Sequence, residues 1–378
     1  MFIYIEVWKF TNLLQIKKDR LCIFTAKLNV MNKFYSLNIK EIIRETEQAV
    51  SLSFEVPENL KELFSFKAGQ YITLKTNIEG KEVRRAYSLC SAPNTNEYKV
   101  SVKEVEGGTF SVLANNKLKV GDVLEVHPPE GKFIFEPGTS KHNYAAFVAG
   151  SGITPVLSII KTVLTEETES KFVLVYGNKT PDDTIFFKEL LELQLEYTER
   201  LFIEFVYSRT QEENAHFGRI EDSTVNYVLK NKFDALNFDK FYLCGPEVMI
   251  DSVSEVLLKN GIEKEKILFE LFTASDSGEI DANLEGETQL TVLVDDEETT
   301  FSMSQKDSVL DAALEKDLDV PYSCQGGICS SCIARITEGK AEMAKNQILT
   351  DSEIAEGLIL TCQAHPTTPT LKVDYDDV

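Results

Sequence analysis

The sequence is poor in basic residues and has no long apolar run near its start. Its 378 residues include 39 lysines and arginines against 61 aspartates and glutamates, a formal net charge of −22. Phosphate backbones are bound by clustered lysine and arginine, so this charge argues against nucleic acid as a partner. No apolar stretch in the first thirty residues is long enough for a signal-peptide core or a membrane span. We therefore expect a cytoplasmic protein without a membrane partner.

Cysteines are few and unevenly placed. There are seven, an odd number, and four of them lie near the C-terminus. A secreted disulfide framework normally has a signal peptide and a shorter chain, which favours a reduced protein here. The acidic excess lies in the same region, because residues 288–378 hold 17 acidic and six basic side chains. This surface is either simply solvated or docks a basic partner protein.

The chain divides into five segments. Residues 34–138 carry short β-branched and aromatic runs between glycine turns, which predict a β-barrel domain. Residues 139–273 alternate apolar strands with helices, which predicts an α/β domain with a parallel sheet. The small polar stretch 274–287 is expected to be a linker to a third domain, 288–378. Residues 1–33 show no regular pattern and are expected to be a disordered or artefactual extension.

A cysteine pattern near the C-terminus is the most specific signal. Three cysteines follow the spacing C-x4-C-x2-C, and a fourth comes after twenty-nine intervening residues. This is the spacing of plant-type [2Fe–2S] ferredoxins, in which four thiolates hold two irons. Glycines in the loop let backbone N–H groups approach the sulfurs. Structural zinc is the alternative, but it usually takes two C-x2–4-C pairs and only one is present. The candidate metal ligands are Cys324, Cys329, Cys332 and Cys362.

Two segments of the β-rich region carry residue types that suit a flavin. In the run 85–88, an arginine can bind a pyrophosphate, an aromatic ring can stack on the isoalloxazine, and a serine can hydrogen-bond it. In the run 102–111, a glycine turn can offer backbone N–H groups to a phosphate. The candidates are Arg85, Tyr87, Ser88, Val102, Lys103, Gly107, Gly108, Thr109 and Ser111.

A glycine-rich turn follows the first buried strand of the α/β region. The run 148–155 lacks the G-x-G-x-x-G dinucleotide fingerprint. We expect Thr154 to cap a helix and Pro155 to begin it, so that the helix N-terminus faces the ligand. A second turn after the last strand contains Cys244, Gly245 and Pro246, and a buried structural cysteine is its alternative explanation.

These motifs together resemble the ferredoxin–NADP reductase superfamily with an added plant-type ferredoxin domain. The resemblance rests on R-x-Y-S at 85–88, G-x-G-x-T-P at 150–155, C-G-P-x-x-M at 244–249 and the cysteine pattern. Over residues 34–378 the chain resembles reductase components of bacterial oxygenases, especially the reductase subunits of phenylacetyl-CoA epoxidases. The resemblance implies an α+β ferredoxin domain, and electron transfer from a nicotinamide through FAD and a [2Fe–2S] cluster to an oxygenase.

The resemblance also implies residue roles. Ser88 and Cys244 are the expected catalytic residues, and Phe272 covers the flavin. Ser208 and Arg209, assisted by Arg219, favour NADPH, with NADH as the alternative. FMN remains open in place of FAD, and a ring-hydroxylating dioxygenase, a desaturase or a hybrid-cluster protein remains open as the acceptor. A zinc-containing redox sensor is the alternative from another class. The expected nicotinamide-binding residues are Gly150, Gly152, Thr154, Pro155, Ser208, Arg209, Cys244, Gly245, Pro246 and Phe272.

Overall fold

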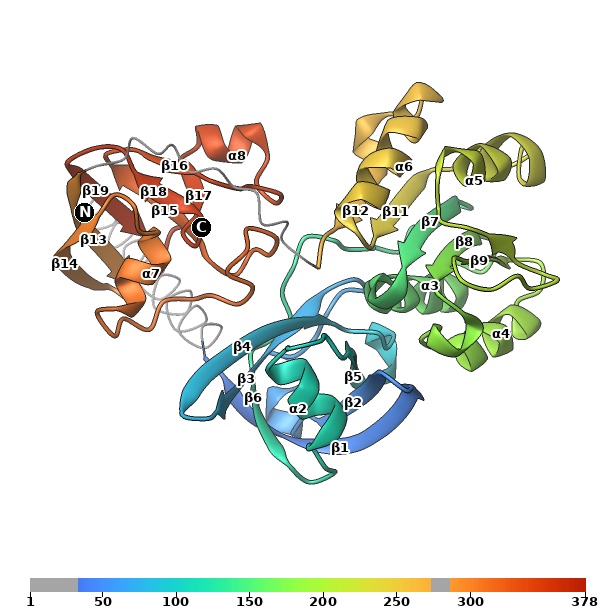
Figure 1. Ribbon diagram of the computed structural model, residues 1–378, viewed down its shortest axis with the longest axis horizontal. Helices are drawn as coiled ribbons and strands as arrows, with labels where there is room; N and C mark the ends of the chain where they lie inside the picture. The colour runs from blue at the N-terminus through green and yellow to red at the C-terminus, as the bar shows by residue number, and fades with distance from the viewer. Residues whose placement is uncertain (1–32, 273–285) are drawn as a thin grey trace, which may run out of the picture.

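The computed structural model describes residues 33–272 and 286–378, which fold into three lobes (Figure 1). Nearly all of the predicted N-terminal extension and most of the predicted linker lie outside the described residues. Within the described ranges, no helix is long and apolar enough to cross a membrane.

The first lobe is an antiparallel barrel. Its six strands lie in the order β4-β3-β6-β1-β2-β5. The sheet closes because Leu89, just after β4, bridges Val100 on β5. Alternate apolar side chains such as Leu52 and Leu74 fill the interior. The elements are β1 (Tyr35–Thr46), β2 (Ala49–Glu55), β3 (Tyr71–Ile78), β4 (Lys81–Ser88), β5 (Tyr98–Lys103), α2 (Phe110–Asn116) and β6 (Val123–Val126), with short 3-10 turns at Glu58–Leu60 and Pro93–Thr95.

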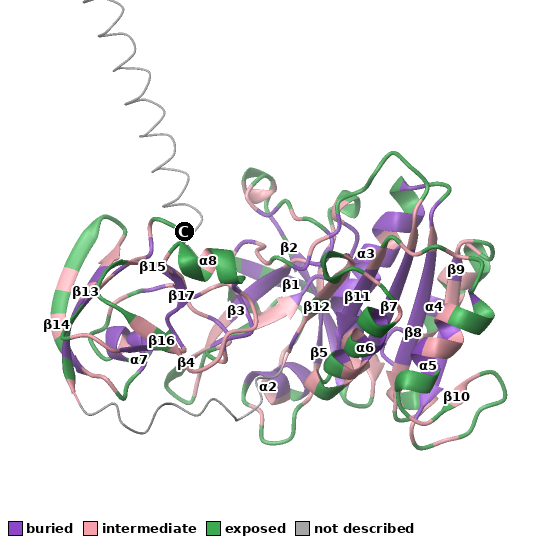
Figure 2. Ribbon diagram, turned by 90° about the horizontal axis from the view of Figure 1, so that it is seen from above, coloured by how far each residue is buried: buried purple, intermediate pink, exposed green. Residues whose placement is uncertain are grey.

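The second lobe is a parallel sheet covered by helices on both faces. Its strands lie in the order β10-β9-β8-β7-β11-β12, so the chain reverses direction across the sheet between β7 and β11. Leu174 packs with α3 and α4, whereas Val173 packs with α5 and α6. Figure 2 accordingly shows the central strands β7, β8 and β11 as largely buried. The elements are β7 (Asn143–Ala149), α3 (Ile153–Glu166), β8 (Lys171–Asn178), α4 (Phe187–Glu196), β9 (Leu201–Tyr207), β10 (His216–Phe217), α5 (Asp222–Tyr227), β11 (Lys240–Cys244), α6 (Glu247–Lys259) and β12 (Ile267–Glu270).

The third lobe is a mixed sheet with a separate two-stranded sheet. The larger sheet has the order β14-β13-β19-β15-β17, and β16 pairs with β18. Ser308 caps α7 by accepting a hydrogen bond from the Asp311 backbone N–H at 3.1 Å. The elements are β13 (Glu287–Val294), β14 (Glu297–Ser304), α7 (Val309–Leu314), β15 (Ile333–Glu338), β16 (Ala341–Met343), α8 (Asp351–Ala355), β17 (Leu358–Leu360), β18 (Ala364–Pro366) and β19 (Thr370–Asp374). The predicted fold class, a barrel, a parallel α/β sheet and an α+β ferredoxin-like domain, is confirmed.

One predicted helix start is wrong. A 3-10 turn covers Gly150–Gly152 and α3 begins at Ile153, so Thr154 is not the cap and Pro155 is not the first helical residue. Thr154 is buried, and its hydroxyl donates to the Ser151 carbonyl oxygen at 3.1 Å. The glycines allow the chain to turn tightly, which starts the helical conformation earlier than a threonine cap would.

Buried hydrogen bonds fix the second lobe against the barrel. The Ser158 hydroxyl on α3 donates to the Ser91 carbonyl oxygen at 2.6 Å. The Lys161 ammonium donates to the Cys90 carbonyl oxygen at 3.2 Å. These carbonyls lie two and three residues beyond the end of β4. The hydrogen bonds therefore fix the position of α3 relative to β4, the strand that carries R-x-Y-S.

Candidate functional site

Two neighbouring cavities lie at the boundaries between the lobes, the first between all three and the second between the barrel and the second lobe. The first, of about 280 Å³, is lined by Arg85 and Ser88 of the barrel, by Glu270 and Phe272 at the end of the second lobe, and by the cysteine loop. The second, of about 580 Å³, lies at the carboxyl ends of the parallel strands. Phe272 lines both cavities, so the two join at its ring. This position, where strand order reverses, is the usual ligand site of an open parallel sheet.

The end of β4 presents the predicted flavin residues. Ser88 is buried and Arg85 is exposed, and both line the first cavity. The Tyr87 ring packs against Phe110 with 5.5 Å between centroids. Burial raises the pKa of the Tyr87 hydroxyl, which therefore stays neutral. The strand thus offers a charge and a hydroxyl to the cavity beside a fixed ring, as a flavin requires.

Glu270 is a candidate site residue that the sequence analysis did not identify. The Ser88 hydroxyl donates to its Oε2 atom at 3.2 Å. Burial raises the Glu270 pKa to about 8, although the hydrogen bond from Ser88 opposes the shift. A carboxyl that is largely neutral at pH 7 and faces a cavity is typical of a proton-handling group. Only its place directly before Leu271-Phe272 at the end of the lobe could have indicated it.

Cys244 lies beneath this site rather than in either cavity wall. Its side chain is fully buried, and its pKa is raised by burial and by the nearby Glu270 carboxyl. A raised pKa keeps the thiol neutral, so it is not a nucleophile. The backbone at Cys244 lies so close to the G-x-G turn that position 152 must be a glycine, because a Cβ on Gly152 would lie 2.2 Å from the Cys244 carbonyl oxygen. The two predicted motifs therefore pack directly against each other.

The predicted phosphate-binding glycines form a tight turn before α2, in which the Gly108 N–H donates to the Val105 carbonyl oxygen at 2.9 Å. Gly107 has a φ of +71°, and a Cβ on Gly108 would lie 2.4 Å from the Ser111 hydroxyl. Ser111 Oγ accepts from the Val105 backbone N–H at 3.2 Å, which fixes the turn. Thr109 directly precedes α2, and Val102 is buried in the barrel core. The region contains a seven-residue helix that the sequence analysis did not anticipate.

Lys103 lies at the second cavity rather than at the barrel alone. A Cβ on Gly150 would come 3.6 Å from its Nζ atom. Burial and the neighbouring Lys179 lower the Lys103 pKa. Both lysines line the second cavity together with Arg219, so positive charge gathers there in an otherwise acidic chain. This cavity suits a phosphorylated ligand.

Most, but not all, of the predicted nicotinamide residues line the second cavity. Ser208 and Arg219 do so, whereas Arg209 is exposed and outside it. Thr154 and Pro155 are buried under the turn and support it from below. The predicted residues that line the cavity are Lys103, Gly150, Gly152, Ser208, Gly245, Pro246 and Phe272.

The four C-terminal cysteines form two pairs. Cys324 interacts with Cys329, and Cys332 with Cys362. In residues 33–272 and 286–378, no three His, Cys, Asp or Glu side chains gather as they would around a single metal ion. Two thiolates per iron are what a [2Fe–2S] cluster needs, whereas zinc needs ligands converging on one point. The pairing of the four cysteines fits the two irons of such a cluster.

The Cys324 sulfur accepts hydrogen bonds from other groups of the cysteine loop. The Cys329 thiol and nearby backbone N–H groups hydrogen-bond to the Cys324 sulfur and lower the pKa of that thiol to about 6. The Gly326 N–H is one of these donors, at 3.3 Å. Gly327 has a φ of +71°, and a Cβ there would lie 3.0 Å from the Lys345 carbonyl oxygen. The loop glycine therefore permits a backbone path that other residues would strain.

Comparison with protein families identifies three parts of the chain. Residues 36–135 match the oxidoreductase FAD-binding domain, 147–255 the oxidoreductase NAD-binding domain, and 292–367 the 2Fe-2S iron-sulfur cluster binding domain. The predicted flavin, nicotinamide and iron–sulfur domains are thereby confirmed, with FAD as the flavin.

Relatives of known activity match nearly end to end. The chain is 36% identical over 351 residues to one of the subunits of 1,2-phenylacetyl-CoA epoxidase from Escherichia coli (strain K12), covering 92% of this chain and 99% of that protein. It is 33% identical to the ferredoxin reductase component of 3-ketosteroid-9-alpha-monooxygenase from Rhodococcus rhodochrous, covering 90% and 96%. Among solved structures, phthalate dioxygenase reductase matches with a TM-score of 0.59 and 25% identity, covering 90% of this chain and 98% of that one.

Proposed function

Because the chain belongs to the family of oxygenase reductase components that join FAD-binding, NAD-binding and 2Fe-2S domains, we propose that it delivers electrons from NADPH to an oxygenase. The observation that carries the proposal is a shared wall: Ser88 of the flavin strand and Cys324 and Cys329 of the cluster loop line one cavity. When bound, the flavin accepts a hydride and the cluster carries single electrons, so one NADPH serves two one-electron deliveries and releases one proton.

The protein's own groups place the reactants. Ser88 and Glu270 present a hydroxyl and a largely neutral carboxyl at the point where the two cavities meet. Phe272 stands between the cavities, so a nicotinamide entering from the second cavity must displace or pack on its ring. Cys244 supports the turn that carries Gly152. We assign catalytic roles to Ser88 and Glu270 and a positioning role to Cys244.

NADPH is proposed in preference to NADH. Lys179, Ser208 and Arg219 line the second cavity, and guanidinium and ammonium groups suit a 2′-phosphate. Arg209, which the motif resemblance pointed to, is exposed outside the cavity, so Arg219 takes its proposed place.

The limits of the three functional parts remain those expected from the pattern. We propose 34–138 for the FAD-binding part, 139–273 for the nicotinamide-binding part and 288–378 for the ferredoxin part, with 274–287 joining the last two. No described strand or helix of these parts crosses a proposed limit by more than one residue, and the one that does is β13, which begins at Glu287.

The proposed acceptor is a phenylacetyl-CoA epoxidase oxygenase. Support comes from the 36% identity to the Escherichia coli epoxidase protein across almost its whole length. The acidic ferredoxin domain, with 17 acidic and six basic residues in 288–378, is the proposed docking region for a basic surface. A cytoplasmic location is proposed because none of the six cysteines in the described parts of the chain forms a disulfide.

Reconstitution tests the proposed acceptor. The purified holoprotein is mixed with NADPH and the phenylacetyl-CoA epoxidase oxygenase, and epoxide formation is followed by chromatography. In parallel it is mixed with the oxygenase of a 3-ketosteroid-9-alpha-monooxygenase system. We expect turnover with the first and far less with the second. Turnover only with the second oxygenase would identify the steroid system as the source of the acceptor. Turnover with neither would rule out both oxygenases as the acceptor.

A further inference from the structure

One face of the barrel holds the cysteine loop through hydroxyl groups. The Tyr71 hydroxyl on β3 lies 3.2 Å from the Ser330 hydroxyl and 3.1 Å from the Ser331 hydroxyl. It also accepts from the Ser330 backbone N–H at 3.3 Å. Ser330 and Ser331 are the two residues between Cys329 and Cys332, so Tyr71 contacts the loop between the two cysteine pairs.

The other end of the loop is held from the same strand. The Thr73 hydroxyl donates to the Ser323 hydroxyl at 3.1 Å in a buried contact. Ser323 directly precedes Cys324. Tyr71 and Thr73 are two residues apart on a strand, so their side chains point to the same face. Two positions on the same face of one strand therefore hydrogen-bond to the loop 323–332 near both of its ends.

Tyr71 also borders the flavin cavity. It is directly opposite Ser88 in the antiparallel pairing of β3 and β4, and its side chain is 4% exposed. Tyr71, Ser88, Cys324 and Cys329 all line the first cavity. A single rigid ring thus spans from the flavin strand to the cysteine loop.

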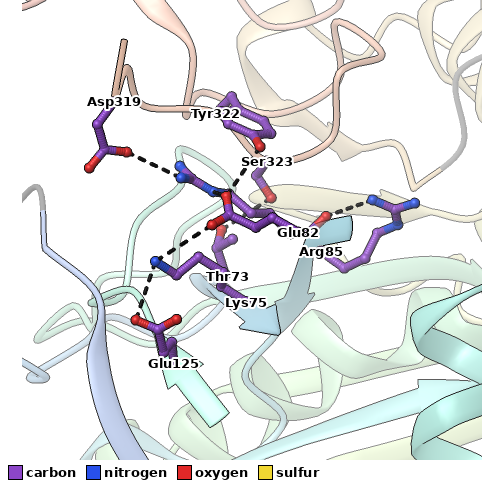
Figure 3. Close-up of polar contacts among 9 residues, drawn as sticks. Thr73, Lys75, Glu82, Arg85, Glu125, Asp319, Tyr322 and Ser323 are labelled. Carbon is purple, nitrogen blue, oxygen red and sulfur yellow. Dashed lines mark hydrogen bonds and ion pairs between the residues drawn. The ribbon is translucent and has the colours of Figure 1, made fainter. Parts of the chain in front are cut away.

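Charged contacts flank these hydroxyls. The Arg84 guanidinium lies over the Tyr322 ring at 4.2 Å and donates to Asp319 at 3.2 Å. The Tyr322 hydroxyl donates to Glu82 at 3.3 Å, and Figure 3 shows Glu82 and Thr73 facing Tyr322 and Ser323 across the two domains. On the other side, the Ser331 hydroxyl donates to Glu130 at 2.6 Å. The loop is therefore held from several directions against one sheet face.

We propose that Tyr71 and Thr73 are positioning residues that set the place of the iron–sulfur loop relative to the flavin cavity. This rests on the proposed function, because it matters only if electrons pass between those two sites. Neither residue is a cysteine ligand; each acts through a serine that neighbours one. Removing the Tyr71 or the Thr73 hydroxyl breaks the hydrogen bonds at one end of the loop, whereas the hydrophobic core of the third lobe stays intact.

The test uses the holoprotein and three variants. Tyr71→Phe removes the hydroxyl and keeps the ring, and Thr73→Val replaces the hydroxyl by a methyl group of similar size. The matched control is Tyr98→Phe on β5, whose ring packs against Phe64 inside the barrel. Rapid mixing with NADPH separates flavin reduction from cluster reduction by absorbance. The EPR spectrum and midpoint potential of the reduced cluster supply a second readout.

We expect cluster reduction to slow by about two- to tenfold in Thr73→Val and at least as much in Tyr71→Phe, the range one lost hydrogen bond gives. The rate of flavin reduction in Thr73→Val should stay within about twofold of the parent rate. The EPR line shape or potential should shift in both variants and not in Tyr98→Phe.

Three results would overturn the inference. These are an unchanged cluster reduction rate and EPR spectrum in both variants, an equal slowing of both phases in Thr73→Val, or the same change in Tyr98→Phe. If Tyr71→Phe does not retain its cofactors, Thr73→Val decides alone. If the parent protein itself shows no cluster reduction by NADPH, the proposed function fails, whatever the variants do.

Discussion

Replacing Glu270 by glutamine tests whether the protonation of this carboxyl controls hydride transfer. Adding a hydride places negative charge at the flavin site, so an ionised carboxylate beside Ser88 opposes the reaction. The Glu270 pKa is raised above its ordinary value to about 8. Roughly nine-tenths of the carboxyl is then neutral at pH 7 and about one-tenth at pH 9. The rate of flavin reduction should therefore fall about tenfold across this range.

The assay is rapid mixing of the oxidised holoprotein with saturating NADPH between pH 6 and pH 9.5, monitored by flavin absorbance. In Glu270→Gln the side chain cannot ionise, so the profile should be flat near pH 8. Glu265→Gln, an exposed position five residues earlier, is the control and should keep the parent profile. A flat profile in the parent, or an unchanged titration in Glu270→Gln, would refute the reasoning.

Three further predictions concern other parts of the molecule. Cys329→Ser should abolish cytochrome c reduction by NADPH but keep ferricyanide reduction; if both survive, the cluster is not on the path. Arg219→Ala should raise the KM for NADPH about tenfold or more, the scale of a charged hydrogen bond, while the KM for NADH barely moves; an equal effect on both would remove its role at the 2′-phosphate. Ser158→Ala leaves the Ser91 carbonyl without its donor at 2.6 Å, so urea unfolding should show a loss of about 1–3 kcal/mol, and no loss would mean that this contact does not hold the lobes.

The sequence was informative where a function depends on local spacing. The cysteine pattern predicted the cluster loop, and the structure adds the pairing of Cys324 with Cys329 and of Cys332 with Cys362. Continuous apolar runs that alternate with helical segments predicted the parallel sheet, because a strand buried on both faces is apolar along its whole length. The prediction that Thr154 caps the helix was wrong, because the helix already begins at Ile153, directly after the glycine turn.

Residues that act across lobes were not visible in the sequence. Glu270 is the last residue of the edge strand β12, and only the fold places it against Ser88, 182 positions earlier in the chain. Tyr71 resembles any barrel tyrosine until its hydroxyl is found between Ser330 and Ser331. Arg209 matched a family position, but the turn after β9 leaves it exposed. The contacts of Glu270 and Tyr71 depend on how separately folded sheets meet, which no local pattern encodes.

The most direct test of the central claim is the absorbance spectrum of the purified holoprotein before and after anaerobic addition of NADPH. A chain that carries electrons from NADPH through FAD to a [2Fe–2S] cluster should show flavin bands with a broader, red-shifted iron–sulfur shoulder, and both should bleach. A flavin spectrum that bleaches without any shoulder, from protein that contains no iron, would contradict the account.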